Sequence, residues 1–444
     1  MRKRLLIFRK DYLLIKIMRR IIYIIFIGLV TVLLLSCKTA YRIRQDNNLA
    51  YIYNPGKATI HPRYKVYHDN DNQSTLFVKV YPVELLFNMA NPEGIYRAEL
   101  GLYYRLYDLT VGRIVVDSGF VKYPVSMHNV KREFIASIPI KAEKAHTYNL
   151  EVVVRDILRN KAVQVFITVD KTSEYNYQNF IVIDHKSGAQ VFNPVVDSSL
   201  ALSILYPKKE IDTLYIRYFK DKSKIPDPPS FLIPSGSMDL EPDSAWSIPY
   251  SDTSILKFPV HGLYQVGISP DRLEGISFSY FGEYFPSVKT PEEMIKPLVY
   301  LATQNEINRL LNDPTPKLAV DDFWLESTSD IEKARELIRI YYNRVLYANY
   351  FFASYKEGWK TDRGMIYIVY GPPDEVFKND EEEKWIFGTK KSSPRISFAF
   401  TKVNNPFTQN DFKLRRNAET KTMWDQAVTS WRSGNTFEIN QIKE

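Results

Sequence analysis

Ionisable side chains gather in one stretch near the C-terminal end of this 444-residue chain. They are four carboxylates with an arginine and a tyrosine beside them: Glu357, Asp362, Asp374, Glu375, Arg363 and Tyr370. Paired carboxylates can act as general acid and base, and a pair at the right separation can cleave a glycosidic bond. The spacing along the chain does not by itself place two of them at such a separation. Acid–base chemistry is therefore one hypothesis for this stretch, and a structural role is the other.

The glycines and polar residues of the stretch also have an explanation in backbone geometry. Gly358 stands where a long predicted helix should end, and glycine tolerates the left-handed conformation found at such ends. Thr361 and Asp362 can accept hydrogen bonds from backbone amides one or two residues on, and Gly364 completes a tight turn. On this interpretation Asp362 shapes a turn and takes part in no reaction.

The neighbouring residues predict which elements that turn connects. Trp359 would fold back onto the apolar face of the preceding helix. The apolar run from Met365 to Tyr370 predicts a buried strand, which Gly371-Pro372-Pro373 would end because proline cannot donate to a sheet. The stretch is thus predicted to be a helix–turn–strand corner.

Two helices are expected to hold this corner from its N-terminal side. Thr290-Pro291-Glu292-Glu293 is typical of a helix start, and the helix is expected to run to about Asn312. After Asp330, apolar residues recur three and four positions apart, which predicts one long amphipathic helix. They are Ile331, Ala334, Ile338, Tyr341, Val345, Ala348 and Phe352.

Strands predicted near 385–388, 395–402 and 412–416 follow the corner, and apolar spacing over 423–431 predicts a closing helix. Helices beside a small antiparallel sheet make an α+β domain, which we place at 289–444. Before it, 59–172 has the short strand-like runs and turn residues of an immunoglobulin-like β-sandwich, and 173–288 repeats the pattern more loosely. The predicted fold is multidomain, with one or two all-β sandwiches followed by an α+β domain.

The N-terminus has the pattern of an export signal. An apolar run from Ile21 to Leu33 follows the basic residues Arg19 and Arg20; it has the length of a signal-peptide core and is short for a membrane span. Leu34-Leu35-Ser36-Cys37 comes next and resembles the lipobox of bacterial lipoproteins, in which the thiol accepts a diacylglyceryl group and cleavage falls between Ser36 and Cys37.

Cys37 is the only cysteine of the chain, so it has no disulfide partner and no companion for a zinc site. We expect 1–36 to be a lipoprotein signal peptide and 37–58 a tether. A plain N-terminal membrane anchor with an incidental cysteine is the alternative, and either Met1 or Met18 could be the start.

The net charge of +8 belongs to the export segment. Residues 1–36 hold eight basic residues and one acid, which gives 8 − 1 = +7, and the rest of the chain carries 51 − 50 = +1. Sequence-independent nucleic-acid binding needs clustered lysine and arginine. The near-neutral body therefore predicts no nucleic-acid partner.

The segment Gly358-Trp359-Lys360-Thr361-Asp362 resembles the name motif of the GWxTD domain found in Bacteroidota and related bacteria. The resemblance covers about 290–440, through Phe323-Trp324, Tyr341–Val345, Tyr347-Ala348-Asn349 and Met365–Glu375 in the same order. The family has no established activity, so the resemblance implies a module and no reaction. It also implies a lipoprotein signal and a preceding β-rich segment.

The residues after Cys37 bear on location. In Bacteroidota, surface export tends to use acidic residues directly after the lipidated cysteine, whereas here Lys38-Thr39-Ala40-Tyr41-Arg42 follows and Asp46 is the first acid. We expect a lipid anchor in the outer membrane, on the periplasmic face in preference to the surface.

No cofactor or metal ion is predicted. The six histidines, His61, His68, His128, His146, His185 and His261, all precede the predicted α+β domain. That domain therefore lacks a histidine base and histidine metal ligands of its own, and the chain has no glycine-rich phosphate loop.

Three functions stay open. The first, which we favour, is a non-enzymatic scaffold or accessory subunit of an outer-membrane protein complex, with envelope proteins as partners. The second is a hydrolase of envelope polysaccharide that uses the carboxylates near the corner. The third is a carbohydrate-binding lipoprotein, suggested by 31 tyrosines, although tyrosine is also a common strand residue.

Overall fold

A computed structural model describes residues 48–89, 96–126, 133–207, 211–232, 238–379, 381–388, 395–437 and 439. The predicted signal peptide, with Ser36 and the lipidation residue Cys37, lies outside the described residues. The described residues fall within one compact unit, Asn47–Glu444. Within these ranges, no helix combines the length and the apolar character that a membrane crossing requires.

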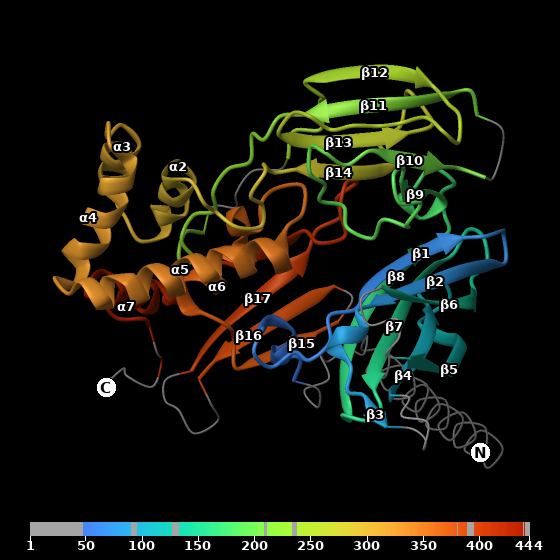
Figure 1. Cartoon of the computed structure of the whole chain (residues 1–444), viewed down its shortest axis with the longest axis horizontal. Coiled ribbons are helices and arrows are strands. Elements are labelled where there is room, and N and C mark those ends of the chain that lie inside the picture. Colours follow the sequence, from blue (N-terminus) through green and yellow to red (C-terminus); the bar gives the residue numbers. More distant parts are fainter. Residues whose placement is uncertain are drawn as a thin grey trace, which may run out of the picture. The chain divides into compact units, whose positions relative to one another are not determined.

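The first β-rich segment is a sandwich of two antiparallel sheets (Figure 1). One sheet has the order β1-β2-β6, with β1 (Arg63–His68), β2 (Gln73–Val80) and β6 (Phe134–Lys141). The other has the order β3-β4-β7-β8, with β3 (Asn88–Met89), β4 (Tyr96–Asp108), β7 (Thr147–Asp156) and β8 (Lys161–Asp170), while β5 (Ile114–Ser126) pairs with β4. Alternate residues point inward, as Ala136, Ile138 and Ile140 do on β6, and the two sheets share one apolar core.

The second β-rich segment has a two-stranded and a four-stranded sheet over a core of its own. The small sheet pairs β9 (Ile181–Asp184) with β10 (Leu202–Leu205). The larger has the order β12-β11-β13-β14, with β11 (Thr213–Phe219), β12 (Ser244–Pro249), β13 (Gly262–Gly267) and β14 (Ile276–Tyr280).

The C-terminal region combines helices with an antiparallel sheet of order β15-β16-β17-β18. Its strands are β15 (Glu375–Lys378), β16 (Glu382–Phe387), β17 (Ile396–Lys402) and β18 (Phe412–Leu414). Its helices are α2 (Pro291–Ile295), α3 (Gln304–Leu311), α4 (Pro316–Thr328), α5 (Ile331–Phe352), α6 (Asp362–Tyr370) and α7 (Lys421–Arg432), with 3₁₀ turns η5 (Lys296–Tyr300), η6 (Gly358–Lys360) and η7 (Ala418–Thr420). Helices α5 and α6 lie along this sheet (Figure 1), and these elements, apart from η7, share one core. The predicted order, all-β segments and then an α+β region, is confirmed.

The helix predicted from Thr290 begins as expected but ends early. Thr290 accepts the Glu293 amide at 3.2 Å in a capping box, yet α2 gives way to η5 at Lys296. Pro297 has no amide to donate to the α-helical ladder, and a second capping box at Thr303 starts α3 anew. The prediction of one helix to Asn312 was therefore wrong.

The strand predicted over Met365–Tyr370 was also wrong, because these residues form α6. The Met365 amide donates to the Thr361 carbonyl at 2.9 Å and the Gly371 amide to the Tyr367 carbonyl at 2.8 Å. Every residue of α6 is buried, so the sequence carries no period that separates a helix from a strand. The motif is thus a turn between two helices.

The prediction that Gly358 adopts the left-handed conformation at a helix end was wrong as well. Helix α5 ends at Phe352, six residues before Gly358, and Gly358 is not among the positive-φ glycines. Gly371 has a φ of +85° and ends α6 instead. The left-handed glycine was therefore expected at the end of α5, but it lies at the end of the next helix, α6.

Part of the predicted tether is integral to the C-terminal region. Leu49, Ala50 and Tyr53, around the 3₁₀ turn η1 (Ala50–Tyr53), are buried in its core. The Leu49 amide donates to the Val376 carbonyl at 2.8 Å, so this segment extends along β15. Residues 48–53 therefore belong to the folded body.

Candidate functional site

Thr361 joins the motif turn to α6. Its Oγ1 accepts a hydrogen bond from the Gly364 amide at 3.0 Å and donates one to the Gly358 carbonyl at 2.7 Å. The first bond satisfies a helix-start amide that would otherwise lack a partner. Thr361 is thus the N-cap of α6, and its buried hydroxyl is already engaged.

The two motif glycines are required for space. A Cβ at Gly358 would lie 2.0 Å from the Ala348 carbonyl oxygen of α5, and a Cβ at Gly364 would lie 2.0 Å from the Gly358 carbonyl oxygen. Both neighbours are backbone atoms and cannot turn aside. Helix α5, the turn and helix α6 therefore pack at a distance that only glycine permits.

Trp359 anchors the turn against the helices. Its side chain is buried, its amide donates to Asn349 Oδ1 of α5 at 3.0 Å, and its carbonyl accepts from the Tyr300 hydroxyl at 2.7 Å. Asn349 also donates through Nδ2 to the Pro286 carbonyl at 2.8 Å. The turn is thereby bound to α5 and to the segment before α2.

Asp362 is a buried ion-pair partner. Its Oδ1 lies 2.7 Å from Arg416 Nη2, and its Oδ2 accepts the Leu414 amide of β18 at 2.9 Å. Burial raises the pKa of Asp362, against the opposing effect of Arg416. Arg416 in turn donates to the Asp227 and Pro228 carbonyls at 2.7 and 2.8 Å, so the pair holds the proline-rich loop of the second β-rich segment.

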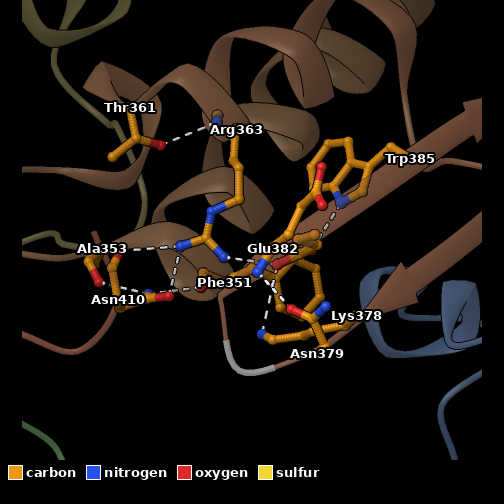
Figure 2. Close-up of polar contacts among 11 residues, drawn as sticks. Phe351, Ala353, Thr361, Arg363, Lys378, Asn379, Glu382, Trp385 and Asn410 are labelled. Atoms are coloured by element: carbon orange, nitrogen blue, oxygen red, sulfur yellow. Dashed lines mark hydrogen bonds and ion pairs between the residues drawn. The ribbon is translucent and has the colours of Figure 1, made fainter. Parts of the chain in front are cut away.

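Arg363 lies at the centre of a buried polar network (Figure 2). Its Nη1 is 3.2 Å from Glu383 Oε2, and its Nη2 donates to the carbonyl and side-chain oxygens of Asn410 at 3.0 and 2.5 Å. Asn410 Nδ2 donates to two carbonyls at the end of α5. Burial opposes ionisation of Glu383, but Lys378 and Arg363 hold the pKa of this carboxyl below its usual range.

The remaining predicted site residues lie at the far end of α6. Tyr370 is buried among aromatic rings, Gly371 ends the helix, and of the two prolines Pro372 is exposed and Pro373 buried. Asp374 Oδ2 accepts the Gly388 amide at 2.7 Å. Glu375 pairs with Arg395 at 2.9 Å.

The four carboxylates named from the sequence therefore do not meet. A helix of nine residues, about 13 Å long, separates Asp362 from Asp374 and Glu375. Glu357 faces a different cavity from Asp362. Each of the four has its own partner, so the geometry provides no paired general acid and base among them.

A cluster that the sequence did not predict lies on the other side of the turn. Lys360 Nζ is 2.5 Å from both Asp221 Oδ2 and Glu357 Oε2. His261 is near enough that one ligand atom each of Asp221, His261 and Glu357 lies within 4.8 Å of the others, a spacing that could hold a metal ion. The Lys360 ammonium lies between the two carboxylates and offsets one of their two negative charges, so the cluster forms an ion-paired joint between the turn and the segment after β11.

The sequence did not predict this joint, since Asp221 and Lys360 lie 139 positions apart. The expectation that no histidine lies near the motif also failed here. All six histidines precede the predicted α+β domain in the chain, but in the folded protein the exposed His261 lies beside Glu357, next to the motif.

A cavity of about 250 Å³ lies beside the turn on the Asp362 side. Its wall combines Tyr355, Lys356 and Asp411 from the C-terminal region with Lys220, Asp221 and neighbouring residues of the second β-rich segment. Burial lowers the pKa of Lys356, and nearby carboxylates including Asp362 oppose that shift. Lysines and aspartates of the C-terminal region and of the second β-rich segment therefore both line this cavity.

Residues 262–433 match the GWxTD domain family. The chain contains a GWxTD domain. The matched segment begins inside the second β-rich segment, at β13, and runs through the helices and the sheet β15-β16-β17-β18 to the end of α7. The GWxTD motif therefore lies at the joint between the helices of its own domain and the second β-rich segment.

Among solved structures, a β-glucuronidase from Bacteroides uniformis is 13% identical over 28% of this chain and 14% of that chain, with a TM-score of 0.17. The Bacteroides uniformis β-glucuronidase 2 bound to cyclophellitol-6-carboxylate aziridine is 12% identical over 26% and 13% of the two chains, also with a TM-score of 0.17. The chain spans only about one seventh of these enzymes, and the likeness carries no argument about activity. No curated protein matches the chain.

Proposed function

We propose that this protein is an exported envelope lipoprotein, anchored through Cys37 to the periplasmic face of the outer membrane, and that it serves as a non-enzymatic scaffold or accessory subunit of an outer-membrane protein complex. The observation that carries the scaffold role is the pairing of the motif's charged groups. Asp362, Arg363 and Glu357 are each bound to partners in the same chain. The GWxTD corner thus stabilises a rigid multidomain body.

An exposed apolar surface on the first sandwich supports a protein partner. Ile114, Val115 and Val116 of β5 are 53%, 52% and 39% exposed, and Phe120, 42% exposed, stacks on Tyr103 of β4 with ring centroids 4.0 Å apart. Strand β5 pairs with β4 on one side, and no described strand pairs with its other edge. Apolar side chains on such an edge are typical of protein contact sites.

Membrane fractionation tests the anchor. Cys37→Ser removes the thiol that would carry the lipid, so we expect the variant to leave the membrane pellet. Ser36→Ala keeps a small residue before the cysteine and should leave the protein in the pellet. A Cys37→Ser protein that pellets as the parent does would contradict the lipoprotein proposal.

Affinity purification of the full chain from detergent extracts tests the scaffold role. We expect envelope proteins to be recovered in stoichiometric amounts with the parent, and to be lost with Val115→Glu, which places a charge on the β5 surface. Val260→Glu is the matched control, since Val260 is 54% exposed and lies outside β4 and β5. Recovery of the chain alone, or equal recovery with all three proteins, would contradict the scaffold role or its assignment to β5.

A further inference from the structure

A second cavity, of about 400 Å³, lies where the first sandwich, the second β-rich segment and the GWxTD domain meet. Its wall is mostly apolar, with Ile167 of β8, Val182 of β9, Phe278 of β14 and Phe412 of β18 among the residues that line it. Cavities that bind small molecules have volumes of about 300 to 1,000 Å³ and mostly apolar walls. This cavity is therefore large enough for an organic ligand.

Three residues that line the cavity each contribute a buried polar atom that has no hydrogen-bond partner among the described residues. These atoms are the Tyr64 hydroxyl, Asn149 Nδ2 and Ser277 Oγ. Asn149 is 1% exposed and Ser277 8% exposed, so bulk water does not serve them. An unsatisfied buried polar group costs about 1 to 3 kcal/mol, and folded proteins keep few of them. Three residues around one apolar cavity therefore carry hydrogen-bonding groups that no described residue engages.

All three atoms can donate a hydrogen bond. An amide nitrogen only donates, and a hydroxyl can donate as well as accept. Burial raises the pKa of Tyr64, so its hydroxyl keeps the proton that it would donate. A group that offers acceptor oxygens can therefore satisfy all three, and the Asn149 amide nitrogen requires an acceptor.

The charges of the wall favour an anion. Lys65, Lys378 and Lys402 line the cavity, and no aspartate or glutamate is among its lining residues. Lys378 lies 3.5 Å from Glu383, and Lys402 donates to Thr168 Oγ1 at 3.0 Å. Lys65 differs, because its hydrogen bond to the Val191 carbonyl is long, at 3.5 Å, and no carboxylate among the described residues lies within ion-pair distance of it.

We propose that this cavity binds an amphipathic organic anion, with its apolar body against the Val182 and Phe278 walls and its acid group toward Lys65 and the unpartnered donors. An apolar chain fills the cavity, and an oxyanion supplies acceptors to groups that now lack them. The site does not depend on lipidation at Cys37 or on the scaffold role. A carboxylate and a phosphate monoester share this chemistry, and the probes below separate them.

Calorimetric titration of the full chain in phosphatidylcholine nanodiscs, with empty nanodiscs subtracted, tests the proposal. The probes are octanoate, octyl phosphate, octanol and octylammonium, which share one chain and differ in the head group. We expect octanoate or octyl phosphate to bind at least tenfold more tightly than octanol, and octylammonium not to bind. The tighter of the two anions identifies the head-group class. Equal binding of octanol and both anions, or no binding of any probe, would overturn the proposal.

Two variants locate the site. Lys65→Met keeps the length of the side chain without its charge and should reduce anion affinity at least tenfold, to the level of octanol. Asn149→Leu removes an unpartnered donor, so it should weaken anion binding while raising the melting temperature of the ligand-free protein. Lys257→Met is the control, because Lys257 is exposed and does not line the cavity. Unchanged anion affinity in Lys65→Met would place the binding elsewhere and overturn the assignment.

The pH dependence gives an independent readout. Burial lowers the pKa of Lys65 to about 8, so in the free protein this lysine loses its charge as the pH rises through that value. Four other titratable groups face the cavity: Tyr64, Tyr177, Lys378 and Lys402. Burial raises the pKa of both tyrosines, which therefore stay neutral. Burial also lowers the pKa of Lys378, although its ion pair with Glu383 opposes that shift. Octanoate affinity should fall as the pH rises above about 8, and Lys65→Met should remove most of that fall.

Discussion

At the scale of single residues, the GWxTD motif is defined by close packing. Gly358→Ala would place a methyl group 2.0 Å from the Ala348 carbonyl oxygen, and relief requires a shift of α5 itself. We expect the free energy of unfolding to fall by about 3 kcal/mol, the upper part of the range for overpacked sites. Urea unfolding followed by tryptophan fluorescence measures it.

Gly56→Ala is the matched control for that substitution. The nearest atom to its added Cβ is Asn54 Oδ1 at 3.5 Å, and Gly56 is not in the left-handed region. Its effect should stay within about 0.5 kcal/mol. Equal, small effects of the two alanines would show that the corner has room and would remove the packing explanation for the motif.

Asp362 allows the structural and chemical interpretations of the motif to be compared. Asp362→Asn leaves the Arg416 charge buried without its carboxylate, so the free energy of unfolding should fall by about 3 kcal/mol. Glu375→Gln breaks a pair whose arginine is 34% exposed and should cost less than about 1 kcal/mol. Thermal unfolding of both variants measures the difference. A normal melting temperature for Asp362→Asn would indicate that Asp362 is free to serve a site.

The sequence predicted local roles at this scale and missed long-range partners. Thr361 and Asp362 were expected to accept amides one or two residues on. Thr361 accepts the Gly364 amide, three residues on, and the prediction was wrong for Asp362, which accepts the distant Leu414 amide. Arg416 lies 54 positions from Asp362, and Glu383 lies 20 positions from Arg363. Residue types show what a side chain can bind locally, but only the folded chain determines which distant charge it meets.

At the scale of elements, periodic segments were predicted well and fully buried ones were not. The amphipathic face after Asp330 predicted α5, whose bounds are Ile331–Phe352. Helix α6 has no exposed face, so its apolar run had no period to reveal it. The strand prediction failed there because β-branched and aromatic residues also suit a buried strand.

The short segment around η1 was assigned to a tether because it is polar and aperiodic, yet it acts as part of the GWxTD core. Tyr53 is 5% exposed, and its ring lies 5.1 to 5.4 Å from Phe351, Phe352 and Trp385. Tyr53→Ala would leave a cavity among these rings, so the free energy of unfolding should fall by about 3 kcal/mol. Hydrogen exchange should also quicken at β15, which bonds this segment.

Tyr284→Ala is the control for that element, since Tyr284 is 38% exposed. It should change the stability by less than about 1 kcal/mol and leave exchange at β15 as it was. If Tyr53→Ala also leaves the stability and the exchange at β15 nearly unchanged, residues 48–53 are a free linker in solution and the packing of η1 does not stabilise the domain.

At the scale of the whole molecule, composition and pattern predicted the order of the β-rich and α+β regions, but not the spaces between them. The apolar cavity takes its wall from all three regions, and each contributes residues with ordinary roles in its own sheet.

The anchor has a geometric consequence if Cys37 is lipidated. The chain from Cys37 to Asn48 advances 48 − 37 = 11 residues and can span at most about 40 Å. The GWxTD domain, which binds Asn48 and Leu49, would then be held close to the membrane.

The joint between the second β-rich segment and the GWxTD domain rests on Lys360, whose ammonium lies between Asp221 and Glu357. Lys360→Met would leave two largely buried carboxylates without a counter-charge, and the free energy of unfolding should fall by about 3 kcal/mol. With Asp221→Asn added, the loss should be smaller than the sum of the single losses by about 1 to 3 kcal/mol. Urea unfolding of the parent, the Lys360→Met and Asp221→Asn single variants and the double variant completes the double-mutant cycle.

The same pair predicts an acid dependence with a definite sign. Burial raises the pKa of Asp221, but Lys360 outweighs it and holds the pKa below the usual range. The Lys360–Asp221 pair therefore contributes its full stability above a pH of about 4, the pKa of Asp221 in the unfolded chain. That contribution is lost as the pH falls through the lower pKa that Asp221 has in the folded protein. Lys360→Met should remove this component of acid unfolding. The exposed pair Lys421–Asp425 is the control, and its coupling should be about 0.5 kcal/mol or less. If the coupling energy between Lys360 and Asp221 were as small as that of the control pair, the joint would not stabilise the contact between the two regions.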